Sequence, residues 1–305
     1  MSWMNTTAGK GVSARPVADT SINPLTARIL SALVMMPLVL AAIYFGFPYF
    51  HALILVGVCI LVWEWRRLVG GGSFTMDGLV LMVGLIGAVG AATYGQYFLS
   101  MTMLCFVAVI FFMSTAVKRL ISKQQKHSPD IEGVAAPGRS MWLAVGAFYI
   151  GIPSLALIWL RGPVGVNAGP EIVFWLFFVV WAADIGAYAA GRLIGGPKLA
   201  PSISPNKTWA GLMGAVVSAA AIGVAASVVL EIGGGIRLAI FSGLLGLVSQ
   251  GGDLLESAVK RHFDVKDSSG LIPGHGGLLD RVDALLAAAV AAALIGLADG
   301  GSMLL

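Results

Sequence analysis

The sequence predicts an all-α, polytopic transmembrane helical protein with about nine spans and a cytoplasmic N-terminus. The 305 residues are 58% hydrophobic and only 11% charged, with a mean hydropathy of +0.89. This is more apolar than one soluble core of that length would hide. Apolar runs of about 20 residues recur along the chain, and a helix needs that length to cross a bilayer. The basic residues lie at alternate ends of these runs.

Residues 1–26 are polar, contain Gly, Ser, Thr and Pro, and lack apolar periodicity. We therefore expect a flexible cytoplasmic tail, and the late start of the first apolar run argues against a signal peptide. Nine apolar runs follow, each predicted to form a span: residues 27–46, 47–65, 76–95, 97–117, 141–160, 171–191, 208–230, 235–257 and 278–298. A tight turn near Phe47-Pro48 should separate the first two spans, and Pro153 should kink the fifth.

The distribution of Lys and Arg supports this count independently. Every basic residue except Arg161 and Arg237 flanks either the N-terminus or the ends of the even-numbered spans. Because basic residues concentrate in cytoplasmic loops, the N-terminus should lie inside and the C-terminus outside. A basic linker, residues 118–140, then separates a four-span region, residues 27–117, from a five-span catalytic region, residues 141–305. We expect this linker to touch anionic headgroups, with recruitment of phosphate groups as the alternative.

Asp184 lies inside the sixth span, where an ionisable side chain is costly unless it is paired or faces water. It is therefore a candidate for substrate binding, and a polar contact between helices is the alternative. The loop that follows combines glycines with basic and hydroxyl side chains, a mixture that suits a triphosphate or a lipid phosphate. A plain cytoplasmic loop remains the other interpretation. The basic and hydroxyl residues of this loop are Arg192, Lys198, Ser202, Ser204, Lys207 and Thr208.

Carboxylates cluster where the eighth span ends and the ninth begins. Four polar residues at i, i+3, i+4 and i+7 of the eighth helix share one face: Asp253, Glu256, Ser257 and Lys260. Asp280 and Asp283 share a face of the ninth helix in the same way. We therefore expect the two helices to present carboxylates to each other at the cytoplasmic rim, where Gly251 and Gly252 permit close approach. Clustered carboxylates without cysteine partners favour a hard cation such as Mg²⁺.

Basic residues lie between these two acidic groups. Lys260, Arg261 and Lys266 can hold phosphate oxygens. His275, within a Gly-His-Gly-Gly turn, can orient a phosphate or move a proton, and capping of the ninth helix is the alternative. His262 is expected to be a solvated loop residue.

The segment of residues 257–283 resembles the signature of the phosphatidate cytidylyltransferases, or CDP-diacylglycerol synthases. Its elements are S-x-V-K-R, K-D-x-S and I-P-x-H-G-G-L-x-D-R-V-D, with every spacing matching. Upstream, D-I-G-A-Y, K-L-A-P-S-I-S-P-N-K-T-W and G-D-L-L-E-S resemble the family in the same order. The resemblance is close over residues 184–283 and rests on hydropathy before them. Two positions depart from the pattern: Ala210 stands where Glu is frequent, and Asn206 where a second basic residue is common.

The resemblance implies that the protein condenses CTP with phosphatidic acid in the inner membrane, on its cytoplasmic side. It implies Mg²⁺ as cofactor, with a second cation left open, and a homodimer; no nucleic-acid partner is expected. Asp253, Asp280 and Asp283 would be the metal ligands and, with Lys260 and Lys266, the catalytic set. The substrate-binding set would be Asp184, Ser204, Lys207, Thr208, Glu256, Ser257, Arg261 and His275.

Two other functions are compatible with these residues. A CTP-dependent kinase of polyprenol-type lipid alcohols would use the same cations, but its substrate would attack the γ-phosphorus. An ion-coupled transporter would bind its ion between Asp184 and Asp253 near mid-membrane. Against the transporter, the polar residues cluster on one side of the membrane, and the sequence shows no pair of matching broken helices.

Overall fold

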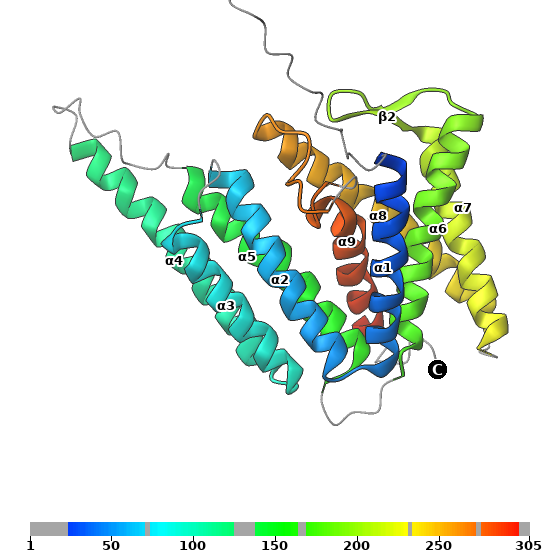
Figure 1. The fold of residues 1–305 in the computed structure, drawn as a ribbon, viewed down its shortest axis with the longest axis horizontal. Helices are drawn as coiled ribbons and strands as arrows, with labels where there is room; N and C mark the ends of the chain where they lie inside the picture. The colour runs from blue at the N-terminus through cyan, green and yellow to red at the C-terminus, as the bar shows by residue number, and fades with distance from the viewer. Residues whose placement is uncertain are drawn as a thin grey trace, which may run out of the picture.

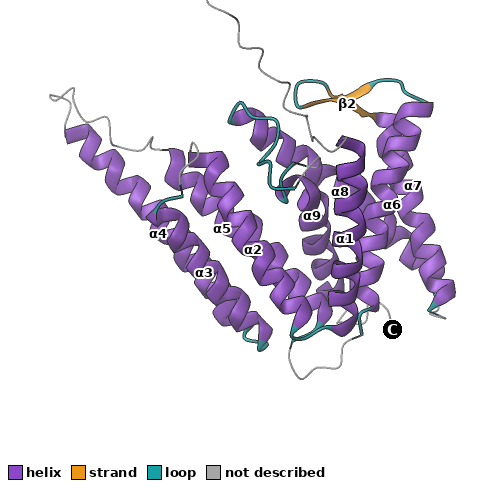
Figure 2. Cartoon of the chain, viewed as in Figure 1, coloured by secondary structure: helices purple, strands orange, loops and turns teal. Residues whose placement is uncertain are grey.

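The computed structural model describes residues 24–70, 74–124, 138–163, 169–230, 234–272 and 276–298. Within these ranges the chain forms nine helices and one short β-hairpin (Figures 1 and 2). The helices are α1 (Pro24–Phe45), α2 (Tyr49–Gly70), α3 (Met76–Thr93), α4 (Tyr97–Gln124), α5 (Gly138–Arg161), α6 (Glu171–Leu193), α7 (Trp209–Val229), α8 (Gly235–His262) and α9 (Leu279–Ala298).

Each predicted span corresponds to one helix, so the predicted all-α membrane architecture is confirmed. In the described part of the chain, seven helices, α3 to α9, are long and apolar enough to cross a membrane, and α1 has a shorter apolar section, Leu33–Phe45. The predicted turn at Phe47-Pro48 joins α1 and α2. Helices α4 and α8 continue beyond the predicted spans. The extension of α8 to His262 keeps Lys260 in helical register with Asp253.

The predicted tail and linker fall largely outside the described ranges. Residues 1–23 and 125–137 are not described, while residues 118–124 continue α4 and residues 138–140 begin α5. In Figure 1 the β-hairpin and the C-terminal ends of α4 and α8 lie at the upper end of the bundle. The C-terminal end of α9 lies at the lower end. This alternation of helix ends matches the alternation of basic residues along the sequence.

The β-hairpin is the one regular element that the sequence analysis treated as a loop. Strands β1 (Lys198–Ala200) and β2 (Ser204–Thr208) pair antiparallel, with Lys198 opposite Thr208 and Ala200 opposite Ser204. Pro197, Pro201 and Pro205 disfavour a helix here, so the segment between α6 and α7 stays extended and pairs with itself. Thr208 then caps α7, because its Oγ1 accepts a hydrogen bond from the Gly211 amide at 3.1 Å.

Helix α9 lies between two groups of buried side chains. One group joins α9 to α2, α3, α4 and α5, and includes Leu286. The other joins α9 to α1, α5, α6, α7 and α8, and includes Leu285. Figure 1 shows the same arrangement, with α3 and α4 on one side, α6 and α7 on the other and α9 between them. The N-terminal end of α9, which carries Asp280 and Asp283, is therefore held from both sides.

Candidate active site

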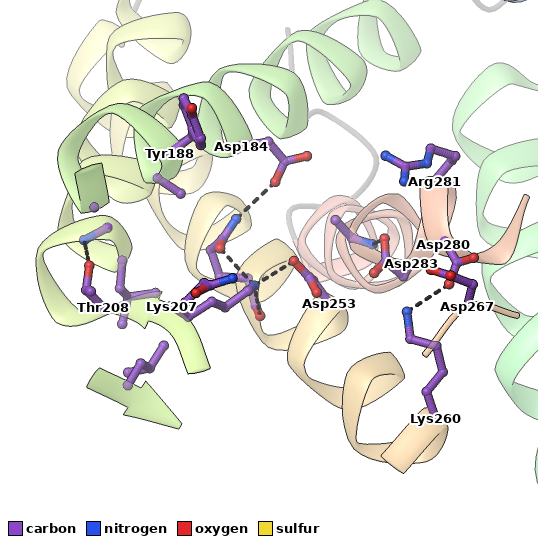
Figure 3. A pocket seen from close by; sticks show the side chains of 18 residues that line it. Asp184, Tyr188, Lys207, Thr208, Asp253, Lys260, Asp267, Asp280, Arg281 and Asp283 are labelled. Atoms are coloured by element: carbon purple, nitrogen blue, oxygen red, sulfur yellow. Dashed lines mark hydrogen bonds and ion pairs between the residues drawn. The ribbon is translucent and has the colours of Figure 1, made fainter. Parts of the chain in front are cut away.

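A polar pocket of about 460 Å³ lies where α6, the β-hairpin, α8 and the start of α9 meet (Figure 3). Eight charged side chains from the described residues line it: Asp184, Asp253, Asp267, Asp280 and Asp283, with Lys207, Lys260 and Arg281. Charged groups are costly within a membrane protein unless they pair with one another or face water. Their contacts form two groups, one around each lysine.

The first group, here named the Lys207 arm, consists of Asp184, Lys207, Gln250 and Asp253. The Lys207 Nζ atom forms an ion pair with Asp253 at 2.7 Å and donates to Gln250 Oε1 at 3.1 Å. Gln250 Nε2 in turn donates to Asp184 Oδ1 at 3.0 Å. Asp184 thus takes part in both arrangements considered from the sequence, because it lines the pocket and also forms a polar contact between α6 and α8.

The second group, the Lys260 arm, consists of Glu256, Lys260, Ser268 and Asp280. The Lys260 Nζ atom lies 2.6 Å from a Glu256 oxygen and 2.8 Å from Asp280 Oδ1. Asp280 Oδ2 also accepts from the Ser268 amide at 3.1 Å, from Ser268 Oγ at 3.0 Å and from the Gly277 amide at 2.8 Å. Protein donors therefore already engage both oxygens of Asp280, a predicted metal ligand.

The meeting of Asp253 and Asp283 depends on a glycine. A Cβ atom at Gly252 would lie 2.8 Å from the Asp283 carbonyl oxygen and 2.7 Å from the Ala287 Cβ atom. Only a residue without a side chain allows α8 and α9 to approach this closely. The close approach predicted from Gly251 and Gly252 is confirmed at Gly252, whereas a Cβ at Gly251 would meet open space. As a result, Asp253 and Asp283 face one pocket from adjacent helices (Figure 3).

These carboxylates are suited to a cation that a substrate helps to hold. Among the described residues, no group of three His, Cys, Asp or Glu side chains is placed to hold a metal ion. Mg²⁺, however, commonly takes one or two protein carboxylates and completes its shell with phosphate oxygens and water. Asp253, whose side chain is 36% exposed, and Asp283 line the same pocket and offer oxygen donors. The residues present therefore fit a Mg²⁺ ion shared with a bound phosphate.

Ser204, Glu256 and Ser257 are predicted site residues that are not among the described residues lining the pocket. Ser257 lies one helical turn from Asp253 and donates to its Oδ1 atom at 3.3 Å. Glu256 is buried behind Lys260. Ser204 belongs to β2, opposite Ala200. Thr208 does line the pocket, but its hydroxyl oxygen is occupied as the cap of α7.

Three further predicted residues, Arg261, Lys266 and His275, are not among the described lining residues either. Arg261 and Lys266 are exposed, and Arg261 Nη1 donates to the Val265 carbonyl oxygen at 3.0 Å. His275 lies outside the described residues. His262, expected to be solvated, is exposed at the end of α8, with its ring 5.0 Å from that of Trp142.

The structure adds residues that the sequence analysis did not select. Asn206, Gln250, Asp267 and Arg281 line the pocket. Glu64 in α2 lies apart from the pocket residues, yet contacts the segments before and after the start of α9. The signal that selected Asp184, an acidic residue near an apolar run, also marks Glu64 and would have found it.

The profile of the cytidylyltransferase family matches residues 26–297. The phosphatidate cytidylyltransferase of Haemophilus influenzae (strain ATCC 51907 / DSM 11121 / KW20 / Rd) is 32% identical over 286 residues, covering 87% of this chain and 96% of that protein. That of Brucella suis biovar 1 (strain 1330) is 52% identical over 157 residues, covering 51% of this chain and 57% of that protein. That of Bacillus subtilis (strain 168) is 40% identical over 146 residues, covering 48% and 54%.

The matches to the Brucella and Bacillus proteins thus span little more than half the length of those relatives. The family profile, in contrast, covers nearly all of the described residues. It confirms the family that the signature at residues 257–283 indicates. This chain belongs to the cytidylyltransferase family.

Proposed function

We propose that the protein is a phosphatidate cytidylyltransferase, which condenses CTP with phosphatidic acid to give CDP-diacylglycerol and pyrophosphate. The main observation in support of this proposal is the set of charged residues that line the pocket, where Asp253 and Asp283 face Lys207 and Lys260. Two polyanionic substrates need fixed cations and metal-binding carboxylates in one place. Family membership and the names of the relatives agree with this chemistry.

In the reaction, a phosphate oxygen of phosphatidic acid attacks the α-phosphorus of CTP. A new phosphorus–oxygen bond forms while the bond to the β-phosphate breaks, and its electrons leave with pyrophosphate. Lys207, Lys260 and Arg281 reduce the repulsion between the two anions and stabilise the departing charge. Because Lys207 is held by Asp253 and Gln250, its ammonium group is positioned before substrate binds.

Asp253 and Asp283 are the proposed ligands of Mg²⁺. A bound Mg²⁺ ion supplies positive charge to the reacting phosphates and orients them. Asp280, selected with them from the sequence, is proposed instead to hold Lys260 and the Ser268 segment. Its side chain is only 6% exposed and is engaged by Lys260, by the Ser268 amide and hydroxyl and by the Gly277 amide, whereas Asp253 is 36% exposed. Asp184 orients Gln250, and through it Lys207.

We further propose that the protein lies in the inner membrane with this pocket on the cytoplasmic side. The excess of Lys and Arg at one set of helix ends supports this orientation. The pocket is lined by residues of the β-hairpin and of the C-terminal half of α8, and both elements reach that end of the bundle (Figures 1 and 3). The phosphatidic acid headgroup can then reach the pocket while its acyl chains stay in the bilayer.

Release of pyrophosphate tests the proposal. Purified protein in detergent is given CTP, phosphatidic acid and Mg²⁺, and pyrophosphate is measured beside CDP-diacylglycerol. We expect equal amounts of both products, and neither product when phosphatidic acid or Mg²⁺ is omitted. Absence of pyrophosphate from the complete mixture would reject the proposal, as would formation of CDP with a phosphorylated lipid alcohol.

A further inference from the structure

Glu64 is a fully buried carboxylate in α2, in the N-terminal region of the chain. Its exposed fraction is 0%. A buried charge is very unfavourable unless hydrogen bonds or opposite charges compensate for its lost hydration. Glu64 lies outside the pocket and is not part of the proposed reaction machinery. The identity of its hydrogen-bond donors therefore indicates what it does.

All recorded donors to Glu64 within the described residues come from the two segments that frame the start of α9. Oε1 accepts from Ser269 Oγ at 2.6 Å and from the Leu278 amide at 2.8 Å. Oε2 accepts from the Leu279 amide at 2.7 Å and, more weakly, from Ser268 Oγ at 3.4 Å. The first amides of a helix have no partner within the helix and favour negative charge. Glu64 thus supplies the cap of α9 from a distant helix.

Ser268 connects this cap to the pocket. Its hydroxyl lies between Glu64 and Asp280, and its amide also donates to Asp280. Asp280 in turn forms the ion pair with Lys260. The junction leaves no room for a side chain at Gly277, where a Cβ atom would collide with Ser268 Oγ and lie 2.6 Å from Glu64 Oε1. The contacts therefore run from α2, through the segment before α9, to the Lys260 arm.

We propose that Glu64 is a positioning residue for nucleotidyl transfer. By fixing the start of α9, it sets where Asp280 and Asp283 lie relative to Asp253 and Lys260. This inference rests on the proposed function, because its effect is on the rate of that reaction. It also gives the N-terminal region a role in the site. Glu64 supports the pocket although it lies outside residues 184–283, which resemble the family most closely.

The substitution Glu64→Gln tests the inference with little change in side-chain volume. Glutamine has one oxygen where glutamate has two, so one amide of Leu278 or Leu279 would face an NH₂ group instead of an acceptor. We expect kcat per folded molecule to fall by at least about tenfold, because small displacements of reacting groups are costly. We expect the KM for CTP to change less than about threefold, since the Lys207 arm is untouched. A residue that only stabilises the fold would lower the folded fraction and leave kcat per folded molecule unchanged.

Ser269→Ala provides a second route, because it removes one donor and keeps the carboxylate. Its matched control is Ser154→Ala, a buried serine of α5 whose hydroxyl donates to the Ile150 carbonyl oxygen at 2.8 Å, within its own helix. We expect Ser269→Ala to lower kcat and Ser154→Ala to leave it unchanged. The double variant with Glu64→Gln should be little worse than Glu64→Gln alone, since both changes disrupt the same group of hydrogen bonds around the Glu64 carboxylate. Additive losses, or a normal kcat in Glu64→Gln, would overturn the inference.

Hydrogen–deuterium exchange of the 305-residue chain without substrates separates this inference from the proposed function. In Glu64→Gln, we expect faster exchange in peptides that contain the amides of Leu278 and Leu279, and unchanged exchange in α6 and α7. Unchanged exchange at the start of α9 would overturn the inference whatever the reaction is. If the wild-type protein releases no pyrophosphate, the proposed function fails, and the exchange result still decides whether Glu64 holds α9.

Discussion

The two lysines of the pocket have similar partners but different surroundings. In the Lys207 arm, the side chains of Lys207 and Asp253 are 16% and 36% exposed. In the Lys260 arm, Lys260 is 12% exposed, and its partners Glu256 and Asp280 are 2% and 6% exposed. The Lys207–Asp253 ion pair is therefore more open to solvent than the Lys260 arm, mainly because Asp253 is more exposed than Glu256 and Asp280.

This difference indicates that the two arms have different roles. An ion pair that is partly exposed contributes at most about 1 kcal/mol, so Lys207 and Asp253 can exchange each other for a phosphate or a cation at little cost. Removing one partner of a buried pair costs about 3–5 kcal/mol, because the other charge is left uncompensated. The Lys207 arm is thus suited to contact the reactants. The Lys260 arm is suited to keep the start of α9 in place.

The largest effect is expected for Asp253→Asn, which removes the negative charge of Asp253 from the Lys207 arm. Loss of a group that acts on the reacting phosphates should lower turnover by about 10²–10³-fold or more. The thermal midpoint in detergent should change little, since substitutions at partly exposed positions cost about 0.5 kcal/mol or less. Pyrophosphate release and a thermal unfolding curve check the two parts. Turnover within tenfold of wild type would refute the role given to the Lys207 arm.

Asp280→Asn should act differently, because it removes the ion pair between Asp280 and Lys260 in the Lys260 arm. Lys260 keeps Glu256 as a partner, while the Ser268 and Gly277 donors lose the charged oxygens of Asp280, so we expect loss of about 1–3 kcal/mol of stability. Turnover should fall about 10–100-fold as α9 shifts. The measurement pairs thermal unfolding with the rate per folded molecule. If this variant were as stable as wild type and as inactive as Asp253→Asn, Asp280 would belong to the reacting set and the contrast between the arms would disappear.

Gln250→Ala tests how Lys207 is positioned within the Lys207 arm. It removes the link between Asp184 and Lys207 but leaves the ion pair of Lys207 with Asp253. Of the two side-chain hydrogen bonds lost, the one that positions Lys207 is worth about 1–1.5 kcal/mol, which predicts a rise of about tenfold in the KM for CTP, with a smaller effect on kcat. Steady-state kinetics at varied CTP would show it. An unchanged KM would mean that Asp253 alone is enough to place Lys207.

The smallest effect is expected for Arg261→Ala. Arg261 is exposed, contacts the Val265 carbonyl oxygen and is not a lining residue of the pocket. Turnover and the KM for CTP should stay within about threefold of wild type, as for most surface substitutions. Lys207→Ala is the matched loss of a cation inside the pocket and should be far more severe. Equal effects of Arg261→Ala and Lys207→Ala would indicate that Arg261 binds phosphate, as the sequence predicts.

Hydropathy and charge were enough to predict the helices, because a bilayer imposes a length and a composition on each span. They could not predict the β-hairpin, because this segment has no apolar pattern. Three prolines keep it extended, and Thr208 at its end caps α7. Spacing along α8 placed Asp253 and Lys260 on one face, and both line the pocket. Spacing could not show that protein donors already engage both oxygens of Asp280. Nor could it relate Glu64 to Ser269, since that contact exists only after α2 packs near α9.

Label transfer from CTP distinguishes attack at the α-phosphorus from attack at the γ-phosphorus. Protein in detergent is incubated with phosphatidic acid, Mg²⁺ and CTP that carries label at either the α- or the γ-phosphate, and the extracted lipid is counted. We expect α-label in the lipid and γ-label in the released pyrophosphate. Appearance of γ-label in the lipid, with no α-label there, would contradict it and identify a kinase.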